Sequence, residues 1–208
     1  MRVLGALLVA AGLAVLGWLG WQIWGTSWQS ERIHRDLVSQ AERHWERGEP
    51  WSASEHGDVT AVIRIPAFGE DYAVPVLEGT SDEVLAAGFG HFEGAAGPGR
   101  RGNYALAGHR VTHGEPLRDM PALEPGDEVV VETQRWTWTY VLDTAGDALT
   151  VDLTDTWVVD PRPTNPDPAG VGPADRRRLL TLTTCAELFH TDDRLIAFGH
   201  LESRERRG

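Results

Sequence analysis

The chain has 208 residues, which is long enough for one ordinary domain with a hydrophobic core and a further segment. Hydrophobic residues make up 41% of it, which excludes a wholly disordered protein. Its 31 acidic and 19 basic residues give a net charge of −12, which argues against nucleic acid as a partner, because phosphate contacts need a basic face. The single cysteine, Cys185, excludes an intrachain disulfide and a four-cysteine zinc site.

The N-terminal segment predicts a membrane anchor. No charged side chain occurs between Arg2 and Glu31, and residues 3–21 form an apolar run of the length that spans a bilayer. We therefore predict a cytoplasmic tip at residues 1–2 and a single transmembrane helix at residues 3–24, surrounded by membrane lipid, with the rest of the chain outside the cell. The alternative is a cleaved signal peptide, but the run is long for one and lacks a small-residue cleavage site.

Residues 25–58 are predicted to form an extracellular stalk or linker. The segment is rich in Arg and Glu, and Ile33 and Leu37 give it only a weak helical stripe. A polar helix that lifts the next domain off the membrane and plain disorder both fit this pattern.

From residue 59 the pattern changes to short strands. In chain order, the predicted elements of this half are a strand at 59–65, a strand at 72–77, a helix at 81–87, a Gly-rich loop at 88–102 and a strand at 104–107. Pro75 predicts that its strand lies at a sheet edge, because proline has no N–H for a second neighbour. Ser81 is the expected N-cap of the helix.

The second half continues as strands joined by turns. Its predicted elements are a helical turn at 116–123, a hairpin of strands 128–133 and 136–142, strands at 149–153 and 157–159, a proline-rich loop at 160–175, and strands at 179–184 and 195–201. We therefore predict a mainly β fold at residues 59–202, a closed or nearly closed barrel of seven to eight strands with short helices. A polar tail would follow at residues 203–208.

Three residues are candidates for catalysis. Cys185 follows one predicted strand directly, and Arg194 opens the next, so pairing of these strands would bring both to one rim of the barrel. A guanidinium beside a thiol lowers the pKa of the thiol and can donate to an oxyanion. His109 follows the strand at 104–107 and is the candidate proton donor and acceptor. Taken singly, each residue also has a purely structural explanation. Cys185 would be a buried thiol, His109 a hydrogen-bonded imidazole and Arg194 an exposed charge.

Metal binding is not predicted. His109 and His113 have a spacing that binds zinc on a helix, but the segment runs into Gly114 and Pro116, where a helix is not expected. The acidic residues also lack the spacing of a calcium-binding loop. We therefore predict no cofactor, and no sequence pattern supports calcium dependence.

Two segments resemble motifs of the sortase family. Residues 102–117, Gly-Asn-Tyr-Ala-Leu-Ala-Gly-His-Arg-Val-Thr-His-Gly-Glu-Pro-Leu, resemble its histidine motif, and residues 180–185, Leu-Thr-Leu-Thr-Thr-Cys, resemble its cysteine motif. Arg194 stands where the family has its arginine, and the resemblance covers roughly residues 59–201. The His-Arg-x-Thr-His-Gly-x-Pro run is most similar to class E sortases of high-GC Gram-positive bacteria, and the use of Arg without Lys agrees with such a source.

The resemblance implies a cysteine transpeptidase at the cell membrane. It would cleave a C-terminal Leu-Ala-x-Thr-Gly or Leu-Pro-x-Thr-Gly sorting signal between Thr and Gly and join secreted proteins to an amine of a peptidoglycan precursor. Cys185 would form the thioester, His109 would transfer protons, and Arg194 would bind the substrate backbone and the oxyanion. Tyr104, Thr183 and Thr184 are expected to contact the substrate, although packing in the sheet also explains them.

Two alternatives remain at this stage. A pilin-polymerising sortase would use a Lys side chain as the acceptor, and such enzymes carry an inhibitory lid that Glu49-Pro50-Trp51 faintly resembles. A non-catalytic, anchored wall-binding barrel would not need its cysteine.

Overall fold

We describe the protein from a computed structural model. The structure describes residues 5, 9–15, 17, 26–49, 54–185 and 192–207. Within these residues, no helix has the length and apolar character needed to cross a membrane. Most of the anchor predicted at residues 3–24 lies outside the described residues, as do Pro50 and Trp51 of the proposed lid motif.

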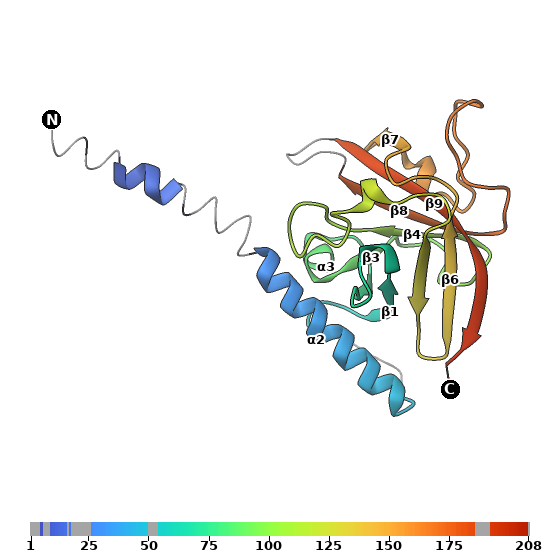
Figure 1. The fold of residues 1–208 in the computed structure, drawn as a ribbon, viewed down its shortest axis with the longest axis horizontal. Helices are drawn as coiled ribbons and strands as arrows, with labels where there is room; N and C mark the ends of the chain where they lie inside the picture. Colours follow the sequence, from blue (N-terminus) through green and yellow to red (C-terminus); the bar gives the residue numbers. More distant parts are fainter. Residues whose placement is uncertain are drawn as a thin grey trace.

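In the described part of the chain, nine strands form a single sheet that closes into a barrel (Figure 1). The strands are β1 (Val59–Arg64), β2 (Val74–Glu78), β3 (Phe89–His91), β4 (Gly102–Ala107), β5 (Glu128–Glu132), β6 (Trp136–Leu142), β7 (Leu149–Asp152), β8 (Arg178–Cys185) and β9 (Asp193–Arg206). Their order is β6-β5-β1-β2-β3-β4-β8-β9-β7, and a further pairing of β6 with β9 closes the ring. Because β7 pairs only with the start of β9, eight strands form the barrel, which confirms the predicted fold.

The interior of the barrel is filled by one face of each strand. On β8, Leu180 and Leu182 point into this core, and on β4 Tyr104 and Leu106 do the same. This is the alternation that a half-buried strand imposes. The opposite faces of β4 and β8 lie beneath a short 3-10 helix at Thr156–Val159, where a strand was predicted. These two faces matter for the site, because they carry its polar side chains.

Helix α2 (Thr26–Glu46) packs on the outside of the barrel and occupies most of the segment predicted to be a stalk or disordered. One face of it is buried against β1, β2 and the short helix α3 (Asp82–Ala87). The buried apolar residues of α2 are Leu37, Val38, Ala41 and Trp45. Arg64 of β1 also pairs with Glu42 of the helix at 2.7 Å. The helix is thus part of the folded domain.

Of the other local predictions, some are confirmed and others are wrong. Ser81 caps α3 by accepting a hydrogen bond from the backbone N–H of Val84 at 3.4 Å, and the β5–β6 hairpin has the expected pairing; both predictions are confirmed. The edge position predicted from Pro75 is wrong, since β2 pairs with β1 on one side and β3 on the other. The pairing with β3 begins only at Val76, so no strand lies beside the proline on that side. β9 continues to Arg206, beyond the predicted barrel boundary.

Candidate active site

A groove of about 380 Å³ lies at the barrel rim where β4 and β8 end and β9 begins. The groove is lined by four of the residues singled out from the sequence, namely His109, Thr183, Thr184 and Arg194. Asp82 of α3 and five residues between positions 153 and 159 also line it. Apolar walls with a few convergent polar groups are typical of a binding site.

Three neighbouring strands bring the candidate catalytic residues to this rim. β4 and β8 run parallel with Ala107 opposite Thr183, and the Gly108 N–H donates to the Thr183 carbonyl at 3.1 Å, so His109 follows directly at the end of both strands. β8 and β9 are antiparallel, and Cys185 is the register partner of Arg194. The side chain of Cys185 lies outside the described part of the structure. The register places its backbone next to that of Arg194, as the sequence predicted.

Arg194 lies among acidic groups at the rim. Its Nη1 donates to the carbonyl of Asp193 at 2.9 Å. Hydrogen bonds from Thr154 lower the pKa of Asp152, and the charge of Arg194 lowers it further. A guanidinium has five N–H groups and can donate to more than one acceptor.

The environment of His109 disfavours its protonated form. Burial lowers the pKa of His109 from 6.5 to about 4, and the neighbouring His113 lowers it too, whereas Asp82 opposes the shift. The rings of His109 and His113 are stacked, with centroids 4.8 Å apart and planes at 29°. The imidazole is therefore neutral at pH 7 and able to accept a proton.

The segment after His109 is a turn rather than a helix. His113 and Glu115 have φ angles of 55° and 49°, on either side of Gly114 at 75°. The two histidines therefore do not have the helical arrangement of a zinc site. Within the described ranges, no group of three His, Cys, Asp or Glu side chains is placed to hold a metal ion.

The structure separates the residues that were expected to bind substrate. Thr183 and Thr184 line the groove, and the Thr184 hydroxyl has no hydrogen-bond partner among the described residues. Tyr104 is only 1% exposed and lies in the barrel core between His91 and Tyr140, so the structure does not bring it to the groove.

Sequence reasoning missed the residue that supports one wall of the groove. Asn103 is fully buried, and its Nδ2 donates to the carbonyls of Val158 and Asp160 at 3.1 Å each. Its Oδ1 accepts from the Thr181 hydroxyl at 2.9 Å. These bonds tie the 3-10 helix to the strands beneath it. The signal in the sequence is an amide in an otherwise apolar strand.

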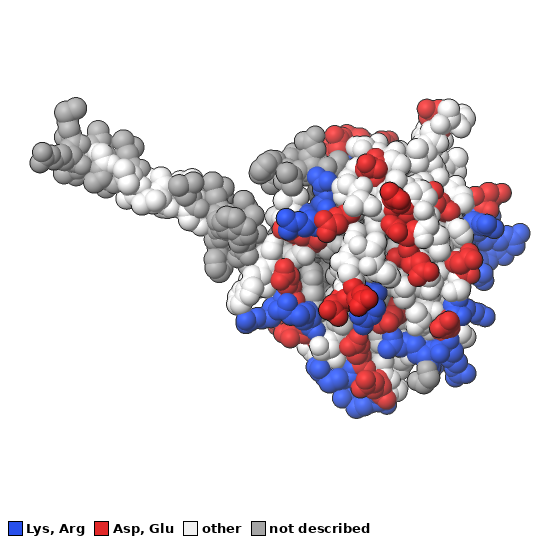
Figure 2. Space-filling model, viewed as in Figure 1, with Lys and Arg blue, Asp and Glu red and all other residues white. Residues whose placement is uncertain are grey.

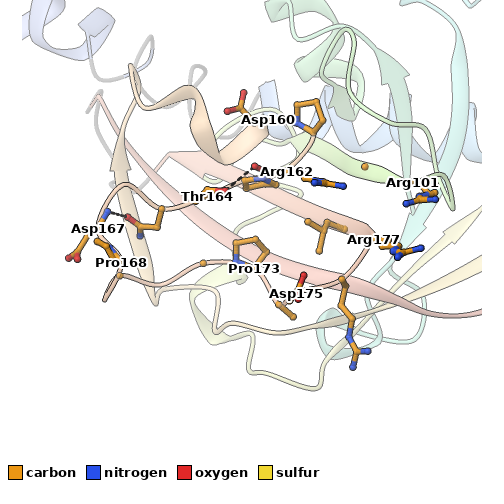
Figure 3. Close-up of a pocket in the computed structure, with 18 residues that line it drawn as sticks. Arg101, Asp160, Arg162, Thr164, Asp167, Pro168, Pro173, Asp175 and Arg177 are labelled. Carbon is orange, nitrogen blue, oxygen red and sulfur yellow. Dashed lines mark hydrogen bonds between the residues drawn. The ribbon is translucent and has the colours of Figure 1, made fainter.

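A larger cavity, of about 1240 Å³, lies at the opposite ends of β4 and β8 (Figure 3). The proline-rich loop predicted at 160–175 forms most of it, and its labelled charges include Arg101, Arg162, Arg177 and Asp160. Gly102 and Leu179 mark the strand starts there, whereas the candidate catalytic residues follow the strand ends. Six residues of extended strand separate the two places by roughly 20 Å. The larger cavity is therefore not part of the candidate site.

Comparisons with known proteins agree with this geometry. The family model described as the sortase domain matches residues 63–202. Sortase SrtE1 of Streptomyces coelicolor is 34% identical over 99% of this chain, which spans 58% of that relative's length. The structure of sortase E from Streptomyces avermitilis is 41% identical, has a TM-score of 0.62, and covers 74% of this chain and 93% of its own. Sortase E1 from Streptomyces coelicolor, solved with a tripeptide in the active site, also has a TM-score of 0.62, is 34% identical, and covers 75% of this chain and 94% of its own. The chain belongs to the sortase family, and class E sortases are among its most similar relatives.

Proposed function

We propose that the protein is a membrane-anchored cysteine transpeptidase that joins secreted proteins to an amine of the cell wall. The observation that carries the proposal is the meeting of three strand ends, where Cys185 and Arg194 are register partners and His109 lines the adjoining groove. Membership of the sortase family and the similarity to class E enzymes support it. The relative with a tripeptide in its active site supports a peptide as the occupant of the groove.

The first half of the reaction forms a thioester. His109 is neutral at rest and takes the proton of the Cys185 thiol, and the thiolate attacks the Thr carbonyl carbon of the sorting signal. Arg194 donates to the oxyanion that develops. The Thr–Gly bond then breaks, and the imidazolium of His109 gives its proton to the leaving Gly amine.

The second half reverses these proton transfers. A neutral acceptor amine attacks the thioester carbonyl, its proton passes to His109, and the Cys185 sulfur leaves as a thiol that has recovered this proton. The new amide bond replaces the one that was cut, so atoms and charge balance. Asp82, Asp152 and Asp155 line the groove, and further acidic side chains are scattered over the upper part of the face in Figure 2. Such a field favours the approach of the acceptor as a cationic ammonium, which releases one proton to solvent and then attacks as the neutral amine.

The test is mass spectrometry of the full chain in detergent micelles with Leu-Ala-x-Thr-Gly and Leu-Pro-x-Thr-Gly peptides and an amine acceptor. We expect an acyl adduct and Thr–Gly cleavage with the wild type and neither with Cys185→Ala. Preference for the Ala peptide would agree with the similarity to class E. Arg194→Ala should retain the adduct but form it roughly 100-fold more slowly, as expected for loss of an oxyanion donor. The absence of adduct and cleavage with both peptides would refute the proposal and favour a non-catalytic wall-binding barrel.

A further inference from the structure

Helix α2 reaches the loop that follows His109. The Ser27 hydroxyl donates to Glu115 Oε1 at 3.3 Å. The His34 ring also lies against Gly114, because a Cβ atom added to this glycine would come within 2.8 Å of His34 Cε1 and 3.4 Å of a backbone nitrogen of the helix. The loop therefore packs directly on the helix, which runs along the barrel in Figure 1.

This loop has a backbone conformation that needs support. His113, Gly114 and Glu115 all have φ angles in the left-handed region, at 55°, 75° and 49°. Residues other than glycine adopt this region rarely, and they keep it when their surroundings hold them there. The Tyr72 hydroxyl fixes the next carbonyl, that of Pro116, at 2.6 Å. On the other side of the loop, the support comes from α2.

Three imidazoles lie in sequence from the helix to the groove. His34 is 4% exposed, and His113 stacks on His109 at 4.8 Å. Burial lowers the pKa of His34 to about 4, and the charges of Arg35, His109 and His113 lower it further, so the three rings are close enough to influence one another. Asp82 is the acid that acts on His109 and His113.

Simple packing does not account for a histidine at this place in the helix. Nε2 of His34 and Nδ1 of His113 are buried and have no hydrogen-bond partner among the described residues. An apolar side chain of similar size would fill the space without leaving a polar atom unpaired. The imidazole therefore points to a role in the site that it adjoins.

We propose that His34 is a positioning residue that fixes the His109 ring through Gly114 and His113, so that docking of α2 completes the active site. This inference rests on the proposed transpeptidase function. It makes the helix next to the predicted anchor part of the catalytic machinery. A change at His34 should affect the chemical step more than peptide binding, since His34 is not among the described residues that line the groove.

The first test measures kcat and KM for peptide cleavage by the full chain in detergent micelles. We expect His34→Ala to lower kcat roughly 10- to 100-fold, with KM within about threefold of wild type, because small misplacements of a catalytic group have effects of this size. His34→Gln, which keeps a polar side chain of similar length, should recover most of the loss. His44→Ala is the matched control, because His44 lies on the same helix but pairs with Glu49 at 3.1 Å near the surface. It should retain wild-type kinetics.

A second readout does not depend on turnover. The ring signals of isotope-labelled histidine can be followed by NMR during a pH titration, with the His109 signal identified by its loss in His109→Ala. In His34→Ala we expect the His109 pKa to move up from about 4 toward 6.5, because the ring gains access to water. An unchanged His109 titration, or a loss of kcat that His34→Gln does not recover, would overturn the proposal. If the wild type forms no acyl adduct, the proposed function fails instead, and the titration still tests the positioning.

Discussion

Mild acid should weaken the fold through His34, and replacing this residue by leucine should remove part of that sensitivity. Burial holds the pKa of His34 at about 4 in the folded protein, against 6.5 for a free imidazole. Between about pH 4 and pH 6.5, His34 is protonated in the unfolded chain but neutral in the folded protein. The free energy of unfolding is therefore highest above pH 6.5, and it falls as the pH decreases from 6.5 toward about 4.

The expected size follows from the two pKa values. Each pH unit between them is worth about 1.4 kcal/mol, so His34 alone should cost the fold about 1.3 kcal/mol when the pH is lowered from about 7.5 to about 5.5. His34 is only 4% exposed, so solvent screening reduces this figure little. The lower limit of this pH range stays above the sequence pI of about 5.0, where the protein carries no net charge.

The assay is urea unfolding of the full chain in detergent micelles, followed by tryptophan fluorescence at several pH values and constant ionic strength. His34→Leu should lose about 1.3 kcal/mol less stability than wild type over this range. His44→Leu controls for the general effect of replacing an imidazole by leucine on the same helix. Parallel pH dependence of wild type and His34→Leu would refute the reasoning, because a buried neutral imidazole must make the two curves diverge.

Three further predictions concern the groove and the barrel. Asn103→Ala should lower the free energy of unfolding by about 1–3 kcal/mol and raise KM in peptide cleavage, because the Asp160 carbonyl loses the Asn103 donor and the Val158 carbonyl keeps only the Thr181 hydroxyl. Gly99→Ala should lower the free energy of unfolding in urea by about 2 kcal/mol or more, since φ is +70° and the new Cβ would lie 2.3 Å from the Trp138 ring. Gly97→Ala is its control and should change this free energy little, because nothing lies within 4 Å of the new Cβ. The pH–rate profile of peptide cleavage should keep its acid limb below 6.5, since the His109 pKa is about 4 and the neutral ring is the base; an acid limb at 6.5 would contradict this.

The strand that carries Cys185 and the strand that carries Arg194 show what local sequence can predict. Two β-rich runs separated by a short segment were expected to pair as neighbours and bring Cys185 and Arg194 to one rim, and the structure adds that the two residues are register partners. The place of His109 did not follow in this way. β4 and β8 are parallel and far apart in the sequence, so His109 was chosen for its chemistry and by the family resemblance, not from strand pairing.

The segment between α3 and β4 shows where glycine misleads. It was predicted as a loop because of its glycines, yet β3 lies within it. A Cβ at Gly90 would come within 2.5 Å of the Gly79 carbonyl, and one at Gly88 within 2.3 Å of the Pro75 carbonyl. Here glycine permits close approach of two backbones rather than a turn. A single sequence does not distinguish these two uses.

The docking of α2 depends on residues that local patterns do not connect. Leu37, Val38, Ala41 and Trp45 do form one face, but charged residues surround them and dilute the stripe. The partners of this face come from β1, β2 and α3, after the predicted stalk. A weakly amphipathic helix becomes stable by such tertiary packing rather than by its own propensity. Whether α2 docks on the barrel therefore depends on residues of β1, β2 and α3, not on the sequence of the helix alone.

The alternation of β4 separates Tyr104 from Asn103 and explains why the expected substrate contact was misplaced. Tyr104 and Leu106 face the core, so Asn103 must face the other side, beneath the 3-10 helix at Thr156–Val159. On the parallel neighbour β8, Thr181 faces the same side and bonds to the same amide. An aromatic residue near a catalytic motif attracts attention because such rings often bind ligands. In a barrel strand, however, position along the pleat decides first which side chains can reach the groove. In β4 the pleat therefore places the amide of Asn103 beneath the groove wall, which it supports, and places the Tyr104 ring in the barrel core.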